Sequence, residues 1–166
     1  MTRSTTAAPP DIASDTLRSE STARTRAIGH ALGLAARPGS VIALRGPLGA
    51  GKTQLAKGVA AGLGIGAVVN SPTFVLMNEH QGRLRLFHID AYRLDDPQEA
   101  FDAGLLDERQ ASGVTVIEWA DRLAGWLPEE RLEIEIVPAP RSARRRTLRW
   151  RAWGAGHTEL AAVLRR

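Results

Sequence analysis

Residues 46–53 have the sequence Gly46-Pro47-Leu48-Gly49-Ala50-Gly51-Lys52-Thr53, which fits the pattern G-x-x-x-x-G-K-S/T. The apolar run Val41-Ile42-Ala43-Leu44 before it predicts a strand buried on both faces, and the apolar spacing of residues 53–63 predicts a helix after it. In this setting the glycines let backbone N–H groups crowd a phosphate where side chains would collide, and the positive helix end adds to the attraction. The stretch therefore predicts a phosphate-binding loop and, with it, nucleotide binding.

Two side chains at the end of this loop are expected to act on the nucleotide. The Lys52 ammonium would reach the β- and γ-phosphates as a point charge, and the Thr53 hydroxyl would ligate Mg²⁺. A nucleotide and Mg²⁺ are therefore the ligands that this stretch predicts.

Two acidic residues end apolar strands further along the chain. Asp90 follows Leu86-Phe87-His88-Ile89, and Glu118 follows Val114-Thr115-Val116-Ile117. Ligands in open α/β sheets gather beyond the carboxyl ends of the strands, so both carboxylates could face the phosphates. One would hold the metal and the other would orient the attacking water, but spacing leaves open which does which. The alternative for either residue is a polar group that begins a solvated loop.

The other apolar patterns predict a three-layer α/β domain of the P-loop NTPase type, with a mixed parallel and antiparallel central sheet. A helix is expected over residues 19–36, capped by Ser21, and a shorter one from Asp95 to Asp102. Two pairs of extended segments and a closing helix complete the expected elements: 74–79 with 83–90, 131–137 with 147–153, and 156–166.

Length and composition limit the class of protein. The 166 residues fit one domain, which we expect over residues 19–166 behind a flexible leader over residues 1–18 that runs into a short edge segment. The absence of cysteine excludes disulfides, thiolate metal sites and thiol catalysis. No run approaches the roughly 18 apolar residues of a membrane span, and the start has no secretory pattern. A cytoplasmic location without a membrane partner is expected.

Other features allow two interpretations each. Six arginines stand in the eleven residues from Arg141 to Arg151, which is typical of contact with RNA phosphates or of a solvated strand face. Ser71-Pro72-Thr73 is either a γ-phosphate-sensing segment or a plain turn. His88 is expected to be a packed core histidine, and Trp119 either stacks on a partner or packs.

Four blocks in this order resemble the TsaE family of bacterial ATPases in tRNA threonylcarbamoyladenosine biosynthesis. They are the loop at residues 46–53, Ser71-Pro72-Thr73-Phe74, His88-Ile89-Asp90-Ala91-Tyr92-Arg93-Leu94 and Ile117-Glu118-Trp119, with a looser fifth at residues 25–29. The likeness covers residues 20–137. Pro47, where the family commonly has Asp, occupies a variable position of the loop, and the arginine-dense segment after Pro140 has no counterpart that we can match.

The resemblance implies a slow, partner-dependent, Mg²⁺-dependent ATP hydrolase. It would act with the proteins TsaB and TsaD in N6-threonylcarbamoyladenosine (t6A) modification of tRNA, and would contact tRNA through that complex. Position by position, it implies that residues Leu48, Gly49, Ala50, Gly51, Lys52 and Thr53 bind the phosphates and that Thr53 and Glu118 bind Mg²⁺. Lys52 and Asp90 would be catalytic, Thr73 and Trp119 functionally sensitive, and Thr22 to Thr25 close to the adenine.

Two other classes of function fit the same loop. A small-molecule kinase would need an acceptor pocket and a lid helix with arginines, and a non-catalytic, nucleotide-gated RNA-binding module would use the Arg141–Arg151 segment. A GTPase is disfavoured because the chain has no N-K-x-D sequence.

Overall fold

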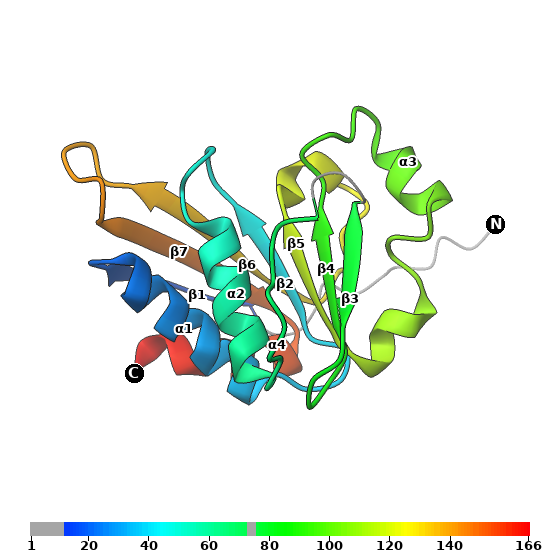
Figure 1. Ribbon diagram of the computed structural model, residues 1–166, viewed down its shortest axis with the longest axis horizontal. Coiled ribbons are helices and arrows are strands. Elements are labelled where there is room, and N and C mark those ends of the chain that lie inside the picture. The colour runs from blue at the N-terminus through cyan, green and yellow to red at the C-terminus, as the bar shows by residue number, and fades with distance from the viewer. Residues whose placement is uncertain (1–11, 73–75) are drawn as a thin grey trace.

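The structure is a computed structural model that describes residues 12–72 and 76–166, and a single mixed sheet organises them (Figure 1). Within these residues the sheet has seven strands in the order β1-β7-β6-β2-β5-β4-β3. The strands are β1 (Ile12–Ser19), β2 (Val41–Arg45), β3 (Met77–His80), β4 (Leu86–Asp90), β5 (Val114–Glu118), β6 (Arg131–Pro138) and β7 (Arg146–Trp153). The central strands β6-β2-β5-β4 are parallel, whereas β3, β7 and β1 pair antiparallel at the edges. This confirms the mixed sheet that the sequence predicts.

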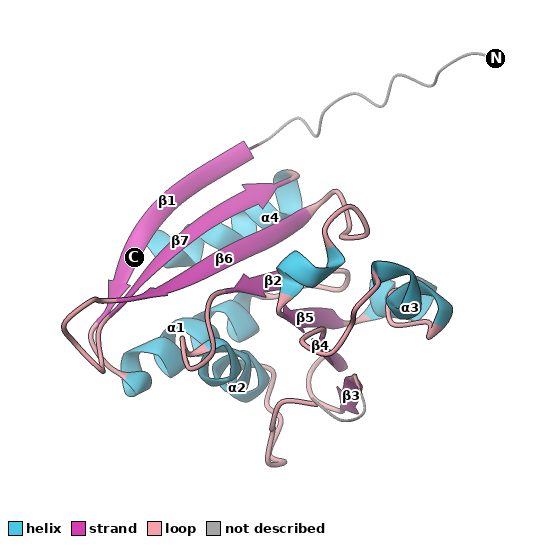
Figure 2. Ribbon diagram, turned by 90° about the horizontal axis from the view of Figure 1, so that it is seen from above, coloured by secondary structure: helices cyan, strands magenta, loops and turns pink. Residues whose placement is uncertain are grey.

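Helices cover both faces of the parallel strands (Figure 2). The core on one face joins Ile42 and Leu44 of β2 to α1 (Thr22–Ala35), α2 (Lys52–Gly62), α4 (Ala155–Ala161) and the 3₁₀ segment η3 (Ala162–Arg165). The core on the other face joins Val41 and Ala43 to α3 (Pro97–Asp102) and the 3₁₀ segment η2 (Ala120–Leu123). The three expected layers are therefore present. No helix in the described part of the chain is long and apolar enough to cross a bilayer.

The phosphate-loop helix α2 packs unusually close to α1 because glycines stand at the contact. A Cβ added to Gly58 would lie 2.2 Å from the carbonyl oxygen of Arg26, and one added to Gly29 would lie 2.2 Å from that of Leu55. Gly33 and Gly62 repeat this close approach one turn further on. The contact between the two backbones therefore fixes the starts of α1 and α2 at the same edge of the sheet.

Helix α1 begins where the Ser21 hydroxyl accepts a hydrogen bond from Arg24 N at 3.1 Å, as its sequence predicts.

The N-terminal part of the chain differs from the leader that we expect over residues 1–18. Residues 12–19 form β1, which pairs with β7 along its whole length, from Ile12 opposite Trp153 to Ser19 opposite Arg146. Residues 1–11 lie outside the described residues. The edge segment is thus longer than predicted, because its order comes from β7 and not from an apolar pattern of its own.

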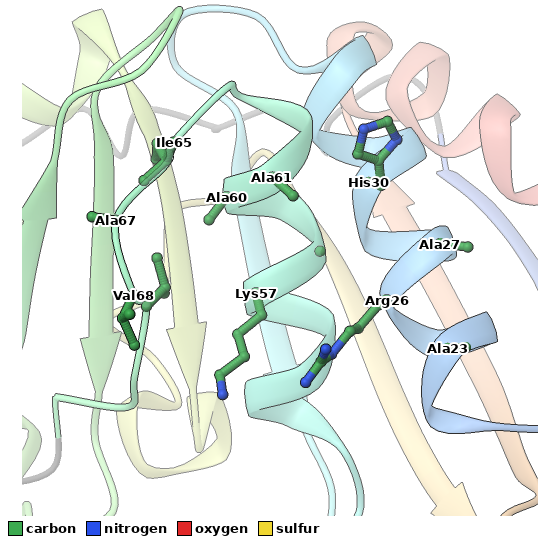
Figure 3. Close-up of a pocket in the computed structure, with 12 residues that line it drawn as sticks. Ala23, Arg26, Ala27, His30, Lys57, Ala60, Ala61, Ile65, Ala67 and Val68 are labelled. Atoms are coloured by element: carbon green, nitrogen blue, oxygen red, sulfur yellow. The ribbon is translucent and has the colours of Figure 1, made fainter.

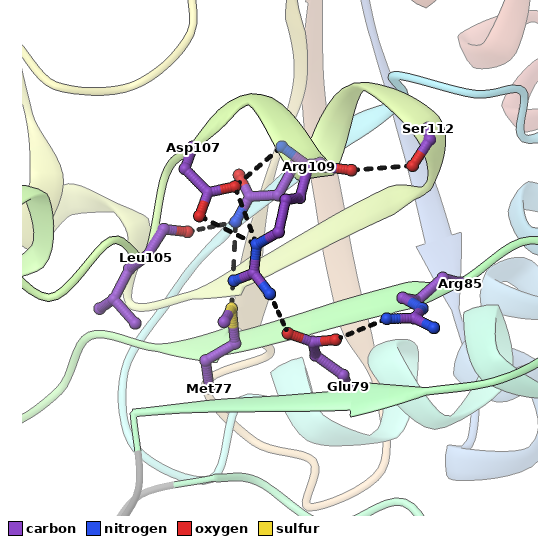
Figure 4. A network of polar contacts seen from close by, with 8 residues as sticks. Met77, Glu79, Arg85, Leu105, Asp107, Arg109 and Ser112 are labelled. Carbon is purple, nitrogen blue, oxygen red and sulfur yellow. Dashed lines mark hydrogen bonds and ion pairs between the residues drawn. The ribbon is translucent and has the colours of Figure 1, made fainter.

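The edge strand β3 is joined to the segment before β5 by surface ion pairs (Figure 4). Glu79 accepts from Arg109 of the 3₁₀ segment η1 (Glu108–Ser112) at 3.2 Å and from Arg85 at 3.0 Å. The strand begins at Met77, whereas the sequence predicts its start at Phe74, which lies outside the described residues. Because these pairs are exposed, water and salt screen them, and they contribute little to stability.

We predict that Gly58→Ala lowers the free energy of unfolding by about 1–3 kcal/mol, because the new methyl group must push α1 and α2 apart. The matched control is Gly66→Ala, whose added Cβ meets no heavy atom of the described residues within 4 Å and whose effect should stay within about 0.5 kcal/mol. Urea unfolding measures both. A Gly58→Ala variant as stable as the wild type, or more stable because alanine favours helices, would contradict the tight contact.

Candidate functional site

The register of the parallel strands brings the predicted carboxylates together at one edge of the sheet. Asp90 at the end of β4 stands opposite Glu118 at the end of β5, and Glu118 stands opposite Leu44 of β2. The loop at residues 46–51 begins directly after β2. Because side chains alternate along a strand, Asp90, His88 and Glu118 all point to the face of the sheet that α2 covers. The loop leads directly into the first residue of α2.

The loop backbone has the conformation that its glycines allow. Gly49 has φ +76° and Gly51, which precedes α2, has φ +112°, values that side-chain-bearing residues rarely adopt. The first N–H groups of a helix have no acceptor within it, so the start of α2 offers donors and positive potential to an anion. Residues 48–54 line the cavity at this point.

Lys52 is buried against the loop. Its Nζ donates to the carbonyl oxygens of Gly46 at 2.6 Å and Pro47 at 2.8 Å, and it lies 3.9 Å from the ring centroid of Trp119. Burial lowers the pKa of Lys52 from its ordinary value, while the carboxylates of Glu118, Asp121 and Asp90 act in the opposite direction. The carboxylates thus offset only part of the effect of burial on the Lys52 ammonium.

Glu118 connects the loop to the core of the sheet. Its Oε1 accepts from the Thr53 hydroxyl at 2.7 Å, and its Oε2 lies 2.6 Å from Nε2 of the fully buried His88. Nδ1 of His88 is buried with no hydrogen-bond partner among the described residues, and Nε2 is the donor, because it faces a carboxylate oxygen, which accepts. His88 is therefore a core histidine, as expected, but one that fixes a carboxylate of the site.

Asp90 is held by a different set of groups. Its Oδ1 accepts from the Tyr92 backbone N–H at 2.9 Å, and its Oδ2 accepts from the Ser71 hydroxyl. The Ser71-Pro72 segment therefore reaches the site, whereas Thr73 lies outside the described residues. The two carboxylates have separate surroundings, Glu118 beside Thr53 and Asp90 beside Ser71.

Trp119 adopts a strained backbone conformation directly after Glu118. Its φ is +57°, which is uncommon for a residue with a bulky side chain and costs on the order of 1–3 kcal/mol. The turn places its ring over Lys52 and 4.7 Å from that of Tyr92. Trp119 thus packs within the site itself.

These groups line one cavity of about 400 Å³. It is bounded by Leu48, Gly49, Ala50, Gly51, Lys52, Thr53, Gln54, Ser71, Asp90, Tyr92, Glu118 and Trp119, which include every site residue predicted in the loop and at the strand ends. A larger hollow of about 520 Å³ lies between α1, α2 and residues 65–69, with Arg26, His30 and Lys57 as its charged or titratable groups (Figure 3). None of the described residues that line this hollow carries a carboxylate, and none of them ends a strand.

The oxygen pair of Thr53 and Glu118 fits a hard divalent cation. Mg²⁺ prefers oxygen ligands and usually keeps several waters and substrate phosphate oxygens beside one or two protein groups. In the described ranges, no three or more His, Asp or Glu side chains form a metal-binding group of their own. A cation at Thr53 and Glu118 would therefore share its shell with other oxygens.

The Arg141–Arg151 segment spans the turn between β6 and β7 and the first part of β7. Arg145 pairs with Glu20 at 2.7 Å and Arg149 lies 3.8 Å from Glu135, so carboxylates stand among the arginines. Residues Thr22 to Thr25, expected near the adenine, form the start of α1, where the buried Thr25 hydroxyl lies 2.7 Å from that of Ser19. Neither group lines the 400 Å³ cavity.

The comparisons with known proteins agree with one another. The family model described as "Threonylcarbamoyl adenosine biosynthesis protein TsaE" matches residues 19–147. A relative from Bacillus subtilis (strain 168), named tRNA threonylcarbamoyladenosine biosynthesis protein TsaE, is 47% identical over 116 residues, which are 69% of this chain and 72% of that protein. A relative of the same name from Treponema pallidum (strain Nichols) is 44% identical over 108 residues, 65% of this chain and 80% of the relative. The crystal structure of Bacillus subtilis YdiB superimposes on this chain with a TM-score of 0.76 at 34% sequence identity. The aligned region covers 93% of this chain and 97% of the YdiB chain.

We predict that His88→Leu lowers the free energy of unfolding by about 3 kcal/mol, because it removes the donor from Oε2 of the buried Glu118 carboxylate, while Thr53 still donates to Oε1. The double variant His88→Leu/Glu118→Leu removes both partners and should recover more than half of that loss. Chemical unfolding of the wild type, the single variants His88→Leu and Glu118→Leu, and the double variant completes the cycle. A double variant as unstable as the sum of the two single changes would show that the pair is not coupled.

Proposed function

The chain belongs to the TsaE family of tRNA threonylcarbamoyladenosine biosynthesis proteins, and we propose that it works there as a Mg²⁺-dependent ATPase. The observation that carries the proposal is the arrangement in one cavity of the phosphate loop, Lys52, the Thr53–Glu118 pair and Asp90. Each has a distinct part to play in hydrolysis.

The loop and Lys52 would bind the triphosphate. Backbone N–H groups at the start of α2 donate to phosphate oxygens, and the Lys52 ammonium neutralises negative charge on the β- and γ-phosphates. Because this charge increases on the leaving oxygen during hydrolysis, a fixed cation stabilises the transition state more than the ground state.

Thr53 and Glu118 would hold Mg²⁺, which when bound shields the phosphate oxygens. Their oxygens already lie 2.7 Å apart, and His88 keeps the Glu118 carboxylate from rotating. This pairing supports the choice of Glu118 as the metal ligand, which the sequence leaves open between the two acids.

Asp90 would orient the attacking water. It lies on the strand next to Glu118, away from the Thr53 contact, and the Tyr92 N–H and Ser71 hydroxyl restrict its carboxylate. A carboxylate fixed in this way can accept a proton from water as the bond to phosphorus forms. Lys52 and Asp90 are thus the proposed catalytic residues.

The family's place in t6A biosynthesis gives the proposed setting. The chain would act in the cytoplasm with TsaB and TsaD, with ATP hydrolysis resetting the modifying complex between rounds on tRNA. The exposed Leu48 at the tip of the loop and the half-exposed Tyr92 and Trp119 leave apolar surface at the mouth of the cavity, where a protein partner can influence hydrolysis.

We expect Lys52→Ala to weaken Mg²⁺–ATP binding about ten- to a hundredfold, since it removes charge-assisted hydrogen bonds to the phosphates. Lys57→Ala is the matched control, because Lys57 is the chain's other lysine and lies on the same helix but lines the other hollow. Isothermal titration calorimetry measures both. If Lys52→Ala binds ATP as Lys57→Ala does, the loop is not the nucleotide site.

We expect Asp90→Asn to change the dissociation constant for ATP by less than about threefold and to lower the rate of ATP hydrolysis about a hundredfold or more. Phosphate release is measured with and without TsaB and TsaD, and phosphoryl transfer to small metabolites is assayed in parallel. Full hydrolysis by Asp90→Asn would reject its role, and transfer to a metabolite would favour the kinase alternative.

A further inference from the structure

The side chain of Arg146, the first residue of β7, contacts the phosphate loop from outside the 400 Å³ cavity. Its Nε donates to the carbonyl oxygen of Ala50 at 2.7 Å and its Nη2 to that of Gly49 at 3.3 Å. Its Nη1 donates to the carbonyl oxygen of Arg145 at 2.9 Å, which fixes the orientation of the guanidinium plane. The side chain therefore binds two consecutive peptide groups of the loop from one position.

The topology of the sheet explains how a residue almost a hundred positions away comes to lie here. β6 is parallel to β2 and β7 is antiparallel to β6, so β7 starts at the edge where β2 ends. Arg146 pairs with Pro138, the last residue of β6, and a Cβ added to Gly46 would lie 2.6 Å from the carbonyl oxygen of Ile136. The loop thus rests on the end of β6, within reach of a long side chain from β7.

The two contacts determine which way the loop's N–H groups point. In a trans peptide the C=O of one residue and the N–H of the next point in opposite directions. A guanidinium that holds the Ala50 carbonyl on the outer side of the loop therefore turns the Gly51 N–H to the inner side, where Gly51 lines the cavity. In the same way, the Gly49 contact turns the Ala50 N–H away from Arg146, and this N–H closes a turn within the loop by donating to the Pro47 carbonyl oxygen at 3.0 Å.

We propose that Arg146 is a positioning residue that sets the phosphate loop in its anion-binding conformation before the nucleotide arrives. Arg146 is not among the described residues that line the cavity, so it acts through the loop. Gly49 and Gly51 make this loop intrinsically mobile, and a loop that is ordered in advance binds its ligand with a smaller loss of conformational entropy. The inference deepens the proposed function and rests on it.

The guanidinium is better suited to this task than an ammonium. Its donors lie in one rigid plane, so Nε and Nη2 meet two neighbouring carbonyls in a fixed orientation, whereas the three donors of a lysine ammonium stand on a flexible stem and fix no orientation. Of the arginine-dense segment, Arg146 is thus the residue with a direct connection to the site, while its neighbour Arg145 pairs with Glu20 at the surface.

The test compares Arg146→Gln, Arg146→Lys and the matched control Arg145→Gln. Calorimetry with Mg²⁺–ATP and Mg²⁺–ADP gives the dissociation constants, and hydrogen–deuterium exchange of a peptide that spans residues 46–53 reports the order of the loop. We expect Arg146→Gln to raise both dissociation constants about tenfold and to speed exchange in the loop peptide. Arg146→Lys should raise the two dissociation constants about three- to fivefold, because charge without the planar fork restores only part of the contact.

The control Arg145→Gln should match the wild type. The kcat at saturating ATP should change by less than about twofold in every variant, since none of them alters a group that reacts.

Three outcomes would overturn the inference: Arg146→Gln binding like the control, Arg146→Lys binding like the wild type, or unchanged exchange in the loop. If Arg146→Gln loses its cooperative thermal transition, Arg146→Lys and its exchange pattern decide alone. A wild type that binds neither nucleotide would instead refute the proposed function, so the two failures are distinguishable.

Discussion

The parallel pairing of β2 with β5 is the constraint on which the site depends. Leu44 of β2 stands opposite Glu118 of β5. The phosphate loop, which follows β2, therefore begins beside the Glu118 carboxylate, which accepts from the Thr53 hydroxyl. β4 continues the same register and brings Asp90 beside Glu118. A shift of one residue in either pairing would turn these carboxylates to the opposite face of the sheet, away from α2.

This arrangement concentrates ionisable groups where burial is costly. Lys52, His88, Asp90 and Glu118 are each at most 4% exposed, yet they share one edge of the sheet. Buried charges persist in proteins when they are paired and hydrogen-bonded, and a cluster of them in a cavity is typical of a functional site. The strained turn at Trp119 adds a further cost at the same place, which a fold optimised for stability alone would not need.

Local patterns in the sequence predict much of this structure, and contacts between distant residues account for what they miss. The loop at residues 46–53 and the strand ends at Asp90 and Glu118 are recognisable because each signal lies within about ten residues. β1 lacks such a signal, since Ile12 and Leu17 stand among polar residues and the strand is ordered by β7. The Arg146 contact depends on β7 starting at the edge of the sheet where the loop lies, which sequence spacing alone does not encode. The sequence predicts the His88–Glu118 contact only in part. Alternation along the strand places His88 on the same face as Asp90, but it does not show which side chain of the next strand His88 contacts.

The most direct test of the account is a crystal structure of the chain with Mg²⁺ and a non-hydrolysable ATP analogue. We predict phosphate oxygens within hydrogen-bond distance of the Gly51, Lys52 and Thr53 N–H groups, the Lys52 Nζ turned from the Gly46 and Pro47 carbonyls to the phosphates, and the metal beside Thr53 and Glu118. An analogue bound in the hollow between α1 and α2, with Lys52 still on those carbonyls, would contradict it.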